Sequence, residues 1–302
     1  MKRGWVLGAL LGVAAWAHAA SYVDDAGRTV DVPTVPQRVV TLAPNLTEFV
    51  YAVGAGDTLV GTMDTSNYPE AARRVPRIGD YQRLDVERIV SLKPDLVLVW
   101  YHGNQGREIE QLEAAGLRLF YLEPRRIDDV PRTLARMGLL LGHAAEGEAR
   151  AATLRAELAA LGRRHAAASP VSVFFQVWSQ PLMTLNGDHL TSDVLAQCGG
   201  RNVFAALPAL APQVSLESVI AADPEDIFTT GDVPPAGPRW RRDTGREALA
   251  IWRSFPKLTA VRRGWMFIVP GDLVTRQGPR IVEGVKAVCE ALDELRLERG
   301  RP

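Results

Sequence analysis

Two glutamates, Glu87 and Glu217, occupy equivalent places in two stretches of the chain that share one pattern. In each stretch a short polar residue, Asp85 or Ser215, precedes an apolar helical pattern, and the glutamate falls in its first turn. A proline then ends the helix before a strand. A single glutamate of this kind merely favours the positive end of a helix dipole. Because the pattern occurs once per half, it predicts a pair of acidic knobs for a roughly two-fold symmetric partner with cationic pockets.

The chain contains two cysteines, Cys198 and Cys289. They do not form a Cys-x-x-Cys motif, so their spacing indicates neither a redox dithiol nor a metal site. In an oxidising compartment two cysteines favour a disulfide, and the alternative is a pair of buried free thiols. A bridge between them would tie the start of the second half of the chain to the final helix.

The first residues indicate which compartment applies. Two basic residues precede an apolar stretch at residues 5–16, and Ala17-His18-Ala19 places small residues where a signal peptidase reads them. The stretch is too short to span about 30 Å of hydrocarbon comfortably, and no cysteine follows it for lipid attachment. We therefore predict that residues 1–20 are a cleaved signal peptide and that the mature chain is exported.

Other residue patterns that perform chemistry are missing from the sequence. A zinc or manganese site requires clustered histidines and carboxylates. The histidines of the mature chain are scattered over both halves, at His102, His143, His165 and His189. The sequence contains no Gly-x-Ser-x-Gly, His-Glu-x-x-His or Walker loop. We expect a binding protein rather than an enzyme, with no metal site and no resident cofactor.

Charge and composition narrow the function classes further. The 302 residues include 35 basic and 35 acidic side chains, for a net charge of +0, and no long basic run is present. Binding to nucleic acid is therefore not expected. Hydrophobic residues make up 47% of the chain, an ordinary globular balance in a chain long enough for two domains.

Both halves of the mature chain alternate strands with helices, which is typical of α/β domains. Short β-branched or apolar runs predict strands at residues 38–42, 59–62, 95–100, 117–122, 171–177, 226–230 and 265–269. Amphipathic runs that end at glycine or proline predict helices at residues 45–53, 84–92, 108–115, 130–141, 192–197, 216–222 and 279–297. The run at 95–100 is apolar almost throughout, which indicates a parallel strand covered on both faces.

A segment of different composition separates the two halves. Residues 144–168 are rich in Ala, Leu, Arg and Glu and contain no proline, so they predict a helix of about 30 Å. The rhythm changes on both sides of this segment, which favours a rigid connector over a surface helix of a single domain. The predicted organisation is a signal peptide at 1–20, an N-terminal α/β lobe at 21–142, a connecting helix at 143–169 and a C-terminal α/β lobe at 170–302.

Several motifs resemble the helical-backbone class, class III, of periplasmic substrate-binding proteins, and within it the family that binds vitamin B12. The first half carries Arg38-Val39-Val40-Thr41-Leu42-Ala43-Pro44-Asn45-Leu46-Thr47-Glu48, Asn67-Tyr68-Pro69, Gly79-Asp80-Tyr81-Gln82 and the run 84–100. The second half carries Cys198-Gly199-Gly200-Arg201-Asn202-Val203-Phe204, Pro212-Gln213-Val214-Ser215 and Arg276-Gln277-Gly278-Pro279-Arg280. The resemblance covers nearly the whole mature chain. It implies two Rossmann-like α/β lobes, joined by a single long helix, with a cleft between them.

The same resemblance implies a ligand and the residues that contact it. A corrin is a large plate with an apolar face and an amide-bearing rim, so aromatic rings suit the plate and polar groups suit the rim. The implied ligand is cobalamin or a related corrinoid. The implied ligand-binding positions are Tyr68, Tyr81, Trp100, Trp178, Asp272 and Arg276, with the aromatic at Trp178 aligning near either Val177 or Trp178.

A partner is implied as well. In this class the ligand is delivered to an ABC transporter in the inner membrane, and the resemblance implies that Glu87 and Glu217 face arginines of its permease dimer. The protein is accordingly expected to be a periplasmic monomer.

One departure from the B12-binding pattern leaves the ligand open. That family has a tryptophan just before Pro-Gln-Val-Ser, where this chain has Ala211. A haem or iron-siderophore binder of the same class is therefore the alternative. Haem would want an axial ligand, which Tyr68, Tyr81 or His102 could supply, but nothing near His102 in the sequence marks it as a ligand.

Overall fold

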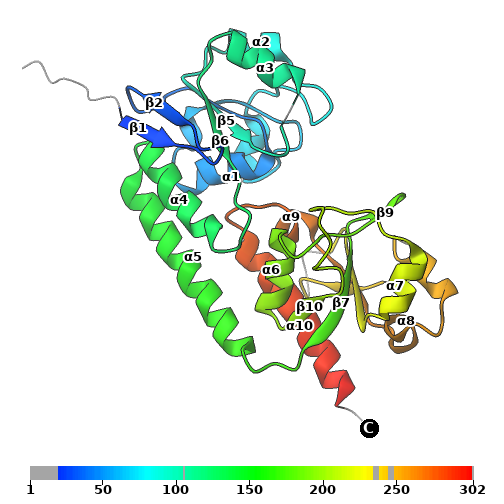
Figure 1. Cartoon of the computed structure of the whole chain (residues 1–302). Coiled ribbons are helices and arrows are strands. Elements are labelled where there is room, and N and C mark those ends of the chain that lie inside the picture. Colours follow the sequence, from blue (N-terminus) through cyan, green and yellow to red (C-terminus); the bar gives the residue numbers. More distant parts are fainter. Residues whose placement is uncertain (1–19, 105, 234–237, 244–247, 301–302) are drawn as a thin grey trace, which may run out of the picture.

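The computed structural model describes residues 20–104, 106–233, 238–243 and 248–300, which form two α/β lobes joined by one long helix (Figure 1). The predicted fold class is confirmed by this architecture. Residues 1–19, nearly all of the predicted signal peptide, lie outside the described residues. Within the described ranges, no helix has the length and hydropathy needed to cross a membrane.

The sheet of the first lobe has four parallel strands in the order β4-β3-β5-β6. The strands are β3 Val39–Thr41, β4 Leu59–Thr62, β5 Leu96–Trp100 and β6 Leu119–Leu122. The helices of this lobe are α1 Pro44–Ala52, η1 Gly56–Thr58, η2 Glu70–Arg74, α2 Val86–Ser91, α3 Arg107–Ala114 and α4 Asp129–Leu140. A hairpin of β1 Ala20–Val23 and β2 Thr29–Val32 precedes the sheet.

Alternate residues of these strands are buried on opposite faces of the sheet, as the two-residue period of a strand requires. Leu96 and Leu98 pack with α1 and α4, whereas Val97 and Val99 pack with α2 and α3. Both faces are therefore covered by helices, which explains why the strand sequence is apolar without interruption.

The second lobe contains a five-stranded sheet in the order β10-β7-β11-β13-β12, in which β12 alone is antiparallel to its neighbour. Its strands are β7 Val171–Gln176, β10 Gly200–Asn202, β11 Asp226–Thr230, β12 Arg241–Arg242 and β13 Met266–Val269. A separate hairpin comprises β8 Trp178–Ser179 and β9 Leu182–Met183. The helices are α6 Leu190–Gln197, α7 Leu216–Ala222, η3 Ala250–Ser254, α8 Thr259–Arg263, α9 Gly271–Val274 and α10 Ile281–Arg299.

The two lobes share one topology. In each lobe the first strand lies between the second and the third, and the fourth follows the third, so that β4-β3-β5-β6 corresponds to β10-β7-β11-β13. The helix before the third strand is α2 in one lobe and α7 in the other. Each of these helices is followed by the same turn, since Lys93 and Asp223 are the two non-glycine residues with positive φ in the described ranges. The internal repeat predicted from the sequence thus has a structural counterpart.

The long helix α5, Ala144–His165, runs from the upper lobe to the lower one (Figure 1). It buries one stripe of side chains, which includes Ala151, Leu154, Leu158 and Leu161. It packs closely on α4, because a Cβ on Gly138 would lie 2.7 Å from the Cα of Gly147. Glycine at both positions therefore allows the two helix backbones to touch and fixes α5 to the first lobe.

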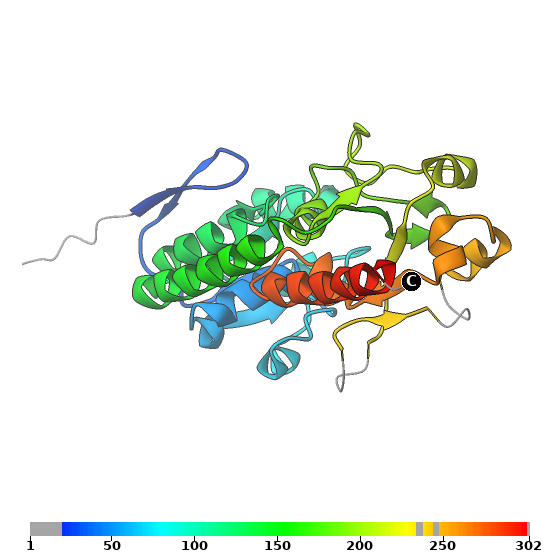
Figure 2. The ribbon, with the colours of Figure 1, turned by 90° about the horizontal axis from the view of Figure 1, so that it is seen from below.

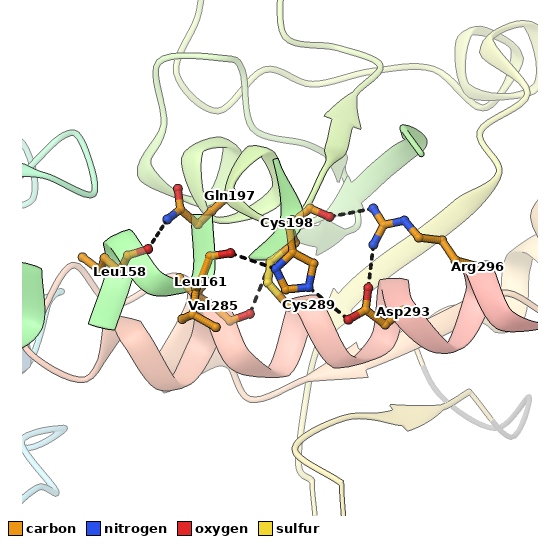
Figure 3. Close-up of a disulfide and its surroundings, with 9 residues drawn as sticks. Leu158, Leu161, Gln197, Cys198, Val285, Cys289, Asp293 and Arg296 are labelled. Atoms are coloured by element: carbon orange, nitrogen blue, oxygen red, sulfur yellow. Dashed lines mark hydrogen bonds and ion pairs between the residues drawn. A yellow bond between two sulfur atoms is a disulfide. The ribbon is translucent and has the colours of Figure 1, made fainter. Parts of the chain in front are cut away.

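The other end of α5 is fixed to the second lobe around the disulfide. The predicted Cys198–Cys289 bridge is confirmed, with an S–S distance of 2.08 Å, and it joins the end of α6 to α10 (Figure 3). Beside it, His165 Nε2 lies 3.0 Å from Asp293 Oδ2, and Gln197 Nε2 donates to the carbonyl oxygen of Leu158 at 2.6 Å. Seen from below, α10 lies alongside α5 (Figure 2). Three helices are thus held together at this end.

Candidate functional site

The candidate ligand residues follow the carboxyl ends of parallel strands in both lobes. Tyr68 and Tyr81 lie in the connection after β4, Trp100 ends β5, and Asp272 and Arg276 follow β13. Open α/β sheets bind ligands outside the carboxyl ends of their strands, where the strand order reverses. Both sheets reverse at their first strand, so the topology alone places a binding edge in each lobe.

Side chains from the two lobes meet directly between these edges. The Oδ1 atom of Asn67 accepts a hydrogen bond from Arg276 Nη1 at 2.9 Å, and Nδ2 of Asn67 lies 3.2 Å from Asp272 Oδ2. Arg276 Nη2 also lies 2.7 Å from Asp272 Oδ1. The side chain of Asp272 is 44% exposed, whereas that of Arg276 is 14% exposed. The carboxylate is therefore the more accessible of the two charged groups.

Tyr81 lies near this polar group, and Trp100 lies beside Tyr81. Their ring centroids are 6.4 Å apart in an edge-to-face arrangement. Tyr81 is 51% exposed overall, but burial around its hydroxyl raises its pKa, while a hydrogen bond with Thr65 and the charge of Arg276 oppose that shift. About half of Tyr81 thus remains accessible, and an aromatic ring suits the face of a planar ligand.

Trp100 is held in place by the chain that follows it. A Cβ on Gly103 would lie 1.8 Å from the indole ring, so the ring rests against the Gly103 backbone. The backbone N–H of Trp100 also donates to Asn104 Oδ1 at 2.9 Å. In the described part of the chain, the buried Nε1 of Trp100 has no hydrogen-bond partner. One face of the indole is therefore covered by protein.

Tyr68 lies on the side of the site nearer to α5. It is 46% exposed, and the guanidinium carbon of Arg280 lies 4.0 Å from its ring centroid, which is a cation–π contact. With Glu48 and Leu154, these two residues line a hollow of about 330 Å³ between the lobes and α5. Tyr68 of the first lobe and Arg280 of the second are thus in contact across the lobe boundary.

Trp178 lies apart from this cluster. It is 62% exposed on the β8–β9 hairpin, and its Nε1 donates to the carbonyl oxygen of Gln180 at 2.8 Å. Within the described residues, no hydrogen bond or ring contact joins Trp178 to the other candidates. Its place in a ligand site stays a prediction.

Sequence reasoning did not single out Glu48, Asn67 and Arg280, although all three lie within the motifs that carry the resemblance. The signal was present at Glu48, which is a lone carboxylate in an apolar helix. Because a carboxylate buried on such a helix needs a partner, it could have been marked as an interface residue from the sequence.

Glu87 and Glu217 are both exposed, each at the second position of its helix. The predicted N-caps are confirmed, since Asp85 Oδ1 accepts from the N–H of Arg88 at 2.9 Å and Ser215 Oγ accepts from the N–H of Ser218 at 3.1 Å. The pKa of Glu217 is lowered by a hydrogen bond with its own backbone N–H and by the Ser215 hydroxyl. It therefore stays a carboxylate at neutral pH.

His102 is engaged outside the cluster. Its Nδ1 lies 3.4 Å from Glu123 Oε2, and Arg125 Nη2 lies 3.0 Å from its Nε2. Among residues 20–104, 106–233, 238–243 and 248–300, no group of three or more His, Cys, Asp or Glu side chains is placed to hold a metal ion.

Comparison with known proteins now identifies the family. A family profile described as periplasmic binding protein matches residues 39–273. The chain belongs to the periplasmic binding proteins. The vitamin B12-binding protein of Photorhabdus laumondii is 35% identical over 261 residues, which covers 86% of this chain and 89% of that protein.

Solved structures of other periplasmic binding proteins have the same fold. The vitamin B12 binding protein of Vibrio cholerae aligns with a TM-score of 0.76 at 30% identity, covering 87% of this chain and 98% of that one. A heme-binding protein from a Roseiflexus species aligns with a TM-score of 0.71 at 26% identity, covering 84% and 98%. The predicted resemblance to the helical-backbone class is thus confirmed, and the family consists of ligand-binding transport components.

Proposed function

We propose that this periplasmic binding protein captures cobalamin or a related corrinoid between its lobes, in the periplasm, and delivers it to an ABC importer. The observation that carries the proposal is the cross-lobe cluster, in which Tyr81 lies near the paired charges of Asp272 and Arg276 and the Trp100 ring lies edge-to-face with Tyr81. The proposal also draws on relatives named vitamin B12-binding proteins, which match over most of this chain.

The residues of the cluster suit binding rather than catalysis. The exposed ring of Tyr81 contacts the apolar face of the macrocycle, and the polar groups of the second lobe meet its rim. These groups follow the ends of strands in two sheets, which supports a site that needs little ordering when the ligand arrives. No bond of the ligand needs to be made or broken for this role.

A titration tests the proposal. Addition of cyanocobalamin to the mature protein should quench tryptophan fluorescence and saturate at a ratio of one to one. Haemin is the comparison ligand. If haemin saturates the protein and neither cyanocobalamin nor cobinamide has an effect, the corrinoid proposal is wrong.

Haem is the second candidate, and one observation favours it. Tyr68 and Tyr81 place two half-exposed phenols near the lobe boundary, and a phenol oxygen can be an axial ligand of haem iron. If haem is the ligand, the haemin complex should show a Soret band that changes on Tyr68→Phe or Tyr81→Phe.

We also propose that Glu87 and Glu217 dock the protein, as a monomer, onto a two-fold permease. The support for this is their equivalent position on α2 and α7, the exposure of both side chains and the shared topology of the two lobes. Two carboxylates on separate lobes suit two cationic pockets related by a two-fold axis.

A further inference from the structure

Glu48 is a buried carboxylate at the boundary between the lobes. It lies on α1 beside the buried residues Leu46, Phe49 and Val50, and its side chain is 2% exposed. A carboxylate in such a place is strongly unfavourable unless it is paired. Its partners are two arginines of the other lobe, Arg276 and Arg280, 228 and 232 residues away in the chain.

Both oxygens of Glu48 accept hydrogen bonds from these arginines. Oε1 accepts from Arg276 Nη1 at 2.9 Å and from Arg280 Nη2 at 2.6 Å, and Oε2 accepts from Arg280 Nε at 2.9 Å. The contact with Arg280 is thus bidentate and charge-assisted. Burial of Arg280 disfavours its charged form, but the hydrogen bond and charge of Glu48, together with Asp272 and Tyr68, outweigh burial, and the pKa of Arg280 is raised.

The arginines are therefore already occupied on the side away from solvent. Arg276 has two further partners, Asp272 and Asn67, and is mostly buried. Glu48 and Asp272 together balance the charges of Arg276 and Arg280. The most exposed member of this set is Asp272, so an arriving ligand first meets a hydrogen-bond acceptor rather than a free guanidinium.

We propose that Glu48 is a specificity-determining residue of the ligand site. Glu48 neutralises Arg276 and Arg280 from the buried side, so that the four charged side chains of the site carry no net charge. Asp272 is then available to accept hydrogen bonds from neutral carboxamides on the rim of the ligand. A rim carboxylate would meet Asp272 and no free arginine, and its desolvation would be uncompensated. This inference rests on the proposed function and names the rim chemistry that the site selects.

Two corrinoids with the same ring test the inference. Dicyanocobinamide carries carboxamides on its rim, whereas dicyanocobyrinic acid carries carboxylates. The quantity to measure is the ratio of their dissociation constants for each variant, by competition with cyanocobalamin. The wild-type protein should prefer the amide.

Glu48→Gln keeps the shape of the side chain and leaves one uncompensated positive charge. We expect it to shift the ratio towards the acid by about 10-fold. Arg280→Gln leaves one uncompensated negative charge and should shift the ratio in the opposite direction. Opposite shifts distinguish a charge effect from a general loosening of the lobe contact, which would weaken both ligands alike. Because the dissociation constants of the two corrinoids are measured on the same sample of each variant, partial unfolding does not change their ratio.

The matched control is Glu148→Gln, an identical charge change on the exposed face of α5, which should leave the ratio unaltered. If wild-type protein binds cyanocobalamin but prefers the acid, or if both Glu48→Gln and Arg280→Gln keep the wild-type ratio, the inference is wrong and the proposed function stands. If wild-type protein binds no corrinoid at all, the proposed function is wrong and the inference falls with it.

Discussion

Tyr81 and Trp100, which we propose to contact a planar ligand, are both held by contacts within their own lobe. The indole of Trp100 rests on the Gly103 backbone, and the hydroxyl of Tyr81 is hydrogen-bonded with Thr65. Each side chain therefore has its orientation set by neighbours of its own lobe. A ring that is already oriented loses little conformational freedom on binding.

Replacing Tyr81 by Ala should weaken cobalamin binding by about 10-fold, because an aromatic contact and its buried area are lost. The measurement is the dissociation constant from fluorescence titration, with thermal unfolding to show that the fold persists. Tyr22→Ala, on the β1–β2 hairpin, is the control and should bind like wild type. Equal affinity of Tyr81→Ala and wild type would remove Tyr81 from the site.

His189 predicts a pH dependence of stability. It caps α6, with Nδ1 accepting from the N–H of Thr191, and burial lowers its pKa from 6.5 to about 4. Between these values the unfolded chain takes up a proton that the folded chain does not, so the free energy of unfolding falls as pH falls from 6.5 towards 4. Down to pH 4.5 this one group should account for a loss of about 2–3 kcal/mol.

His189→Asn keeps a capping side chain and does not titrate. Urea unfolding of the two proteins at pH 7.5 and pH 4.5 should show a smaller loss for the variant. If both lose the same stability, His189 is not responsible for acid sensitivity in this range.

At the scale of elements, the repeat of α2 and α7 explains why two glutamates 130 positions apart occupy equivalent exposed positions on the two lobes. Each helix is short, begins at a capping side chain and ends in a positive-φ residue before a central strand. Each helix leads directly into the third strand of its sheet, so the shared topology sets the place of its glutamate in each lobe.

Reversing both charges, with Glu87→Lys and Glu217→Lys, should reduce corrinoid uptake by at least about 100-fold, because two favourable contacts become repulsive. Ligand affinity should stay within the range of wild type, since neither residue touches the cross-lobe cluster. Uptake in a strain that lacks the endogenous binding protein is the measurement, and Glu148→Lys is the control. Normal uptake by the reversed protein would exclude these glutamates from docking.

The elements that the sequence predicted well are those whose pattern is local. Strand 226–230 and helix 216–222 agree with the structure at both ends, because a proline and a capping serine delimit them. The β8–β9 hairpin and the edge strand β12 were not predicted, since two-residue strands have too short a pattern to recognise.

The part of the candidate site that the sequence could not supply is the contact of Glu48 with Arg276 and Arg280. These residues lie on different lobes, and no local periodicity relates positions more than 200 residues apart. The resemblance implied Arg276 as a ligand residue, which stays a prediction, but it did not imply the contacts of Arg276 with Glu48 and Asn67. The local sequence determines the helices and strands, whereas the packing of the two lobes determines which charged side chains can still contact a ligand.

For the whole molecule, the disulfide should contribute stability without contributing to binding. Cys198→Ala with Cys289→Ala should lower the free energy of unfolding by about 2–5 kcal/mol, because the bridge closes a long loop in the unfolded chain. Cobalamin affinity should change by less than about 3-fold, since the bridge joins the end of α6 to α10 and none of the predicted ligand residues belongs to either helix. Urea unfolding and titration of the double variant are the measurements. An affinity loss as large as the stability loss would show that the bridge shapes the cleft.

The contact of Gly138 with Gly147 fixes one end of α5 to the first lobe, and the contact of His165 with Asp293 fixes the other end to the second lobe. A helix fixed at both ends can bend slightly, but it does not provide a flexible hinge for a large rotation of one lobe. We therefore expect the two lobes to keep their relative orientation when a ligand binds. Ligand selectivity would then depend on the shape and charge of the facing lobe surfaces rather than on the free energy of lobe closure.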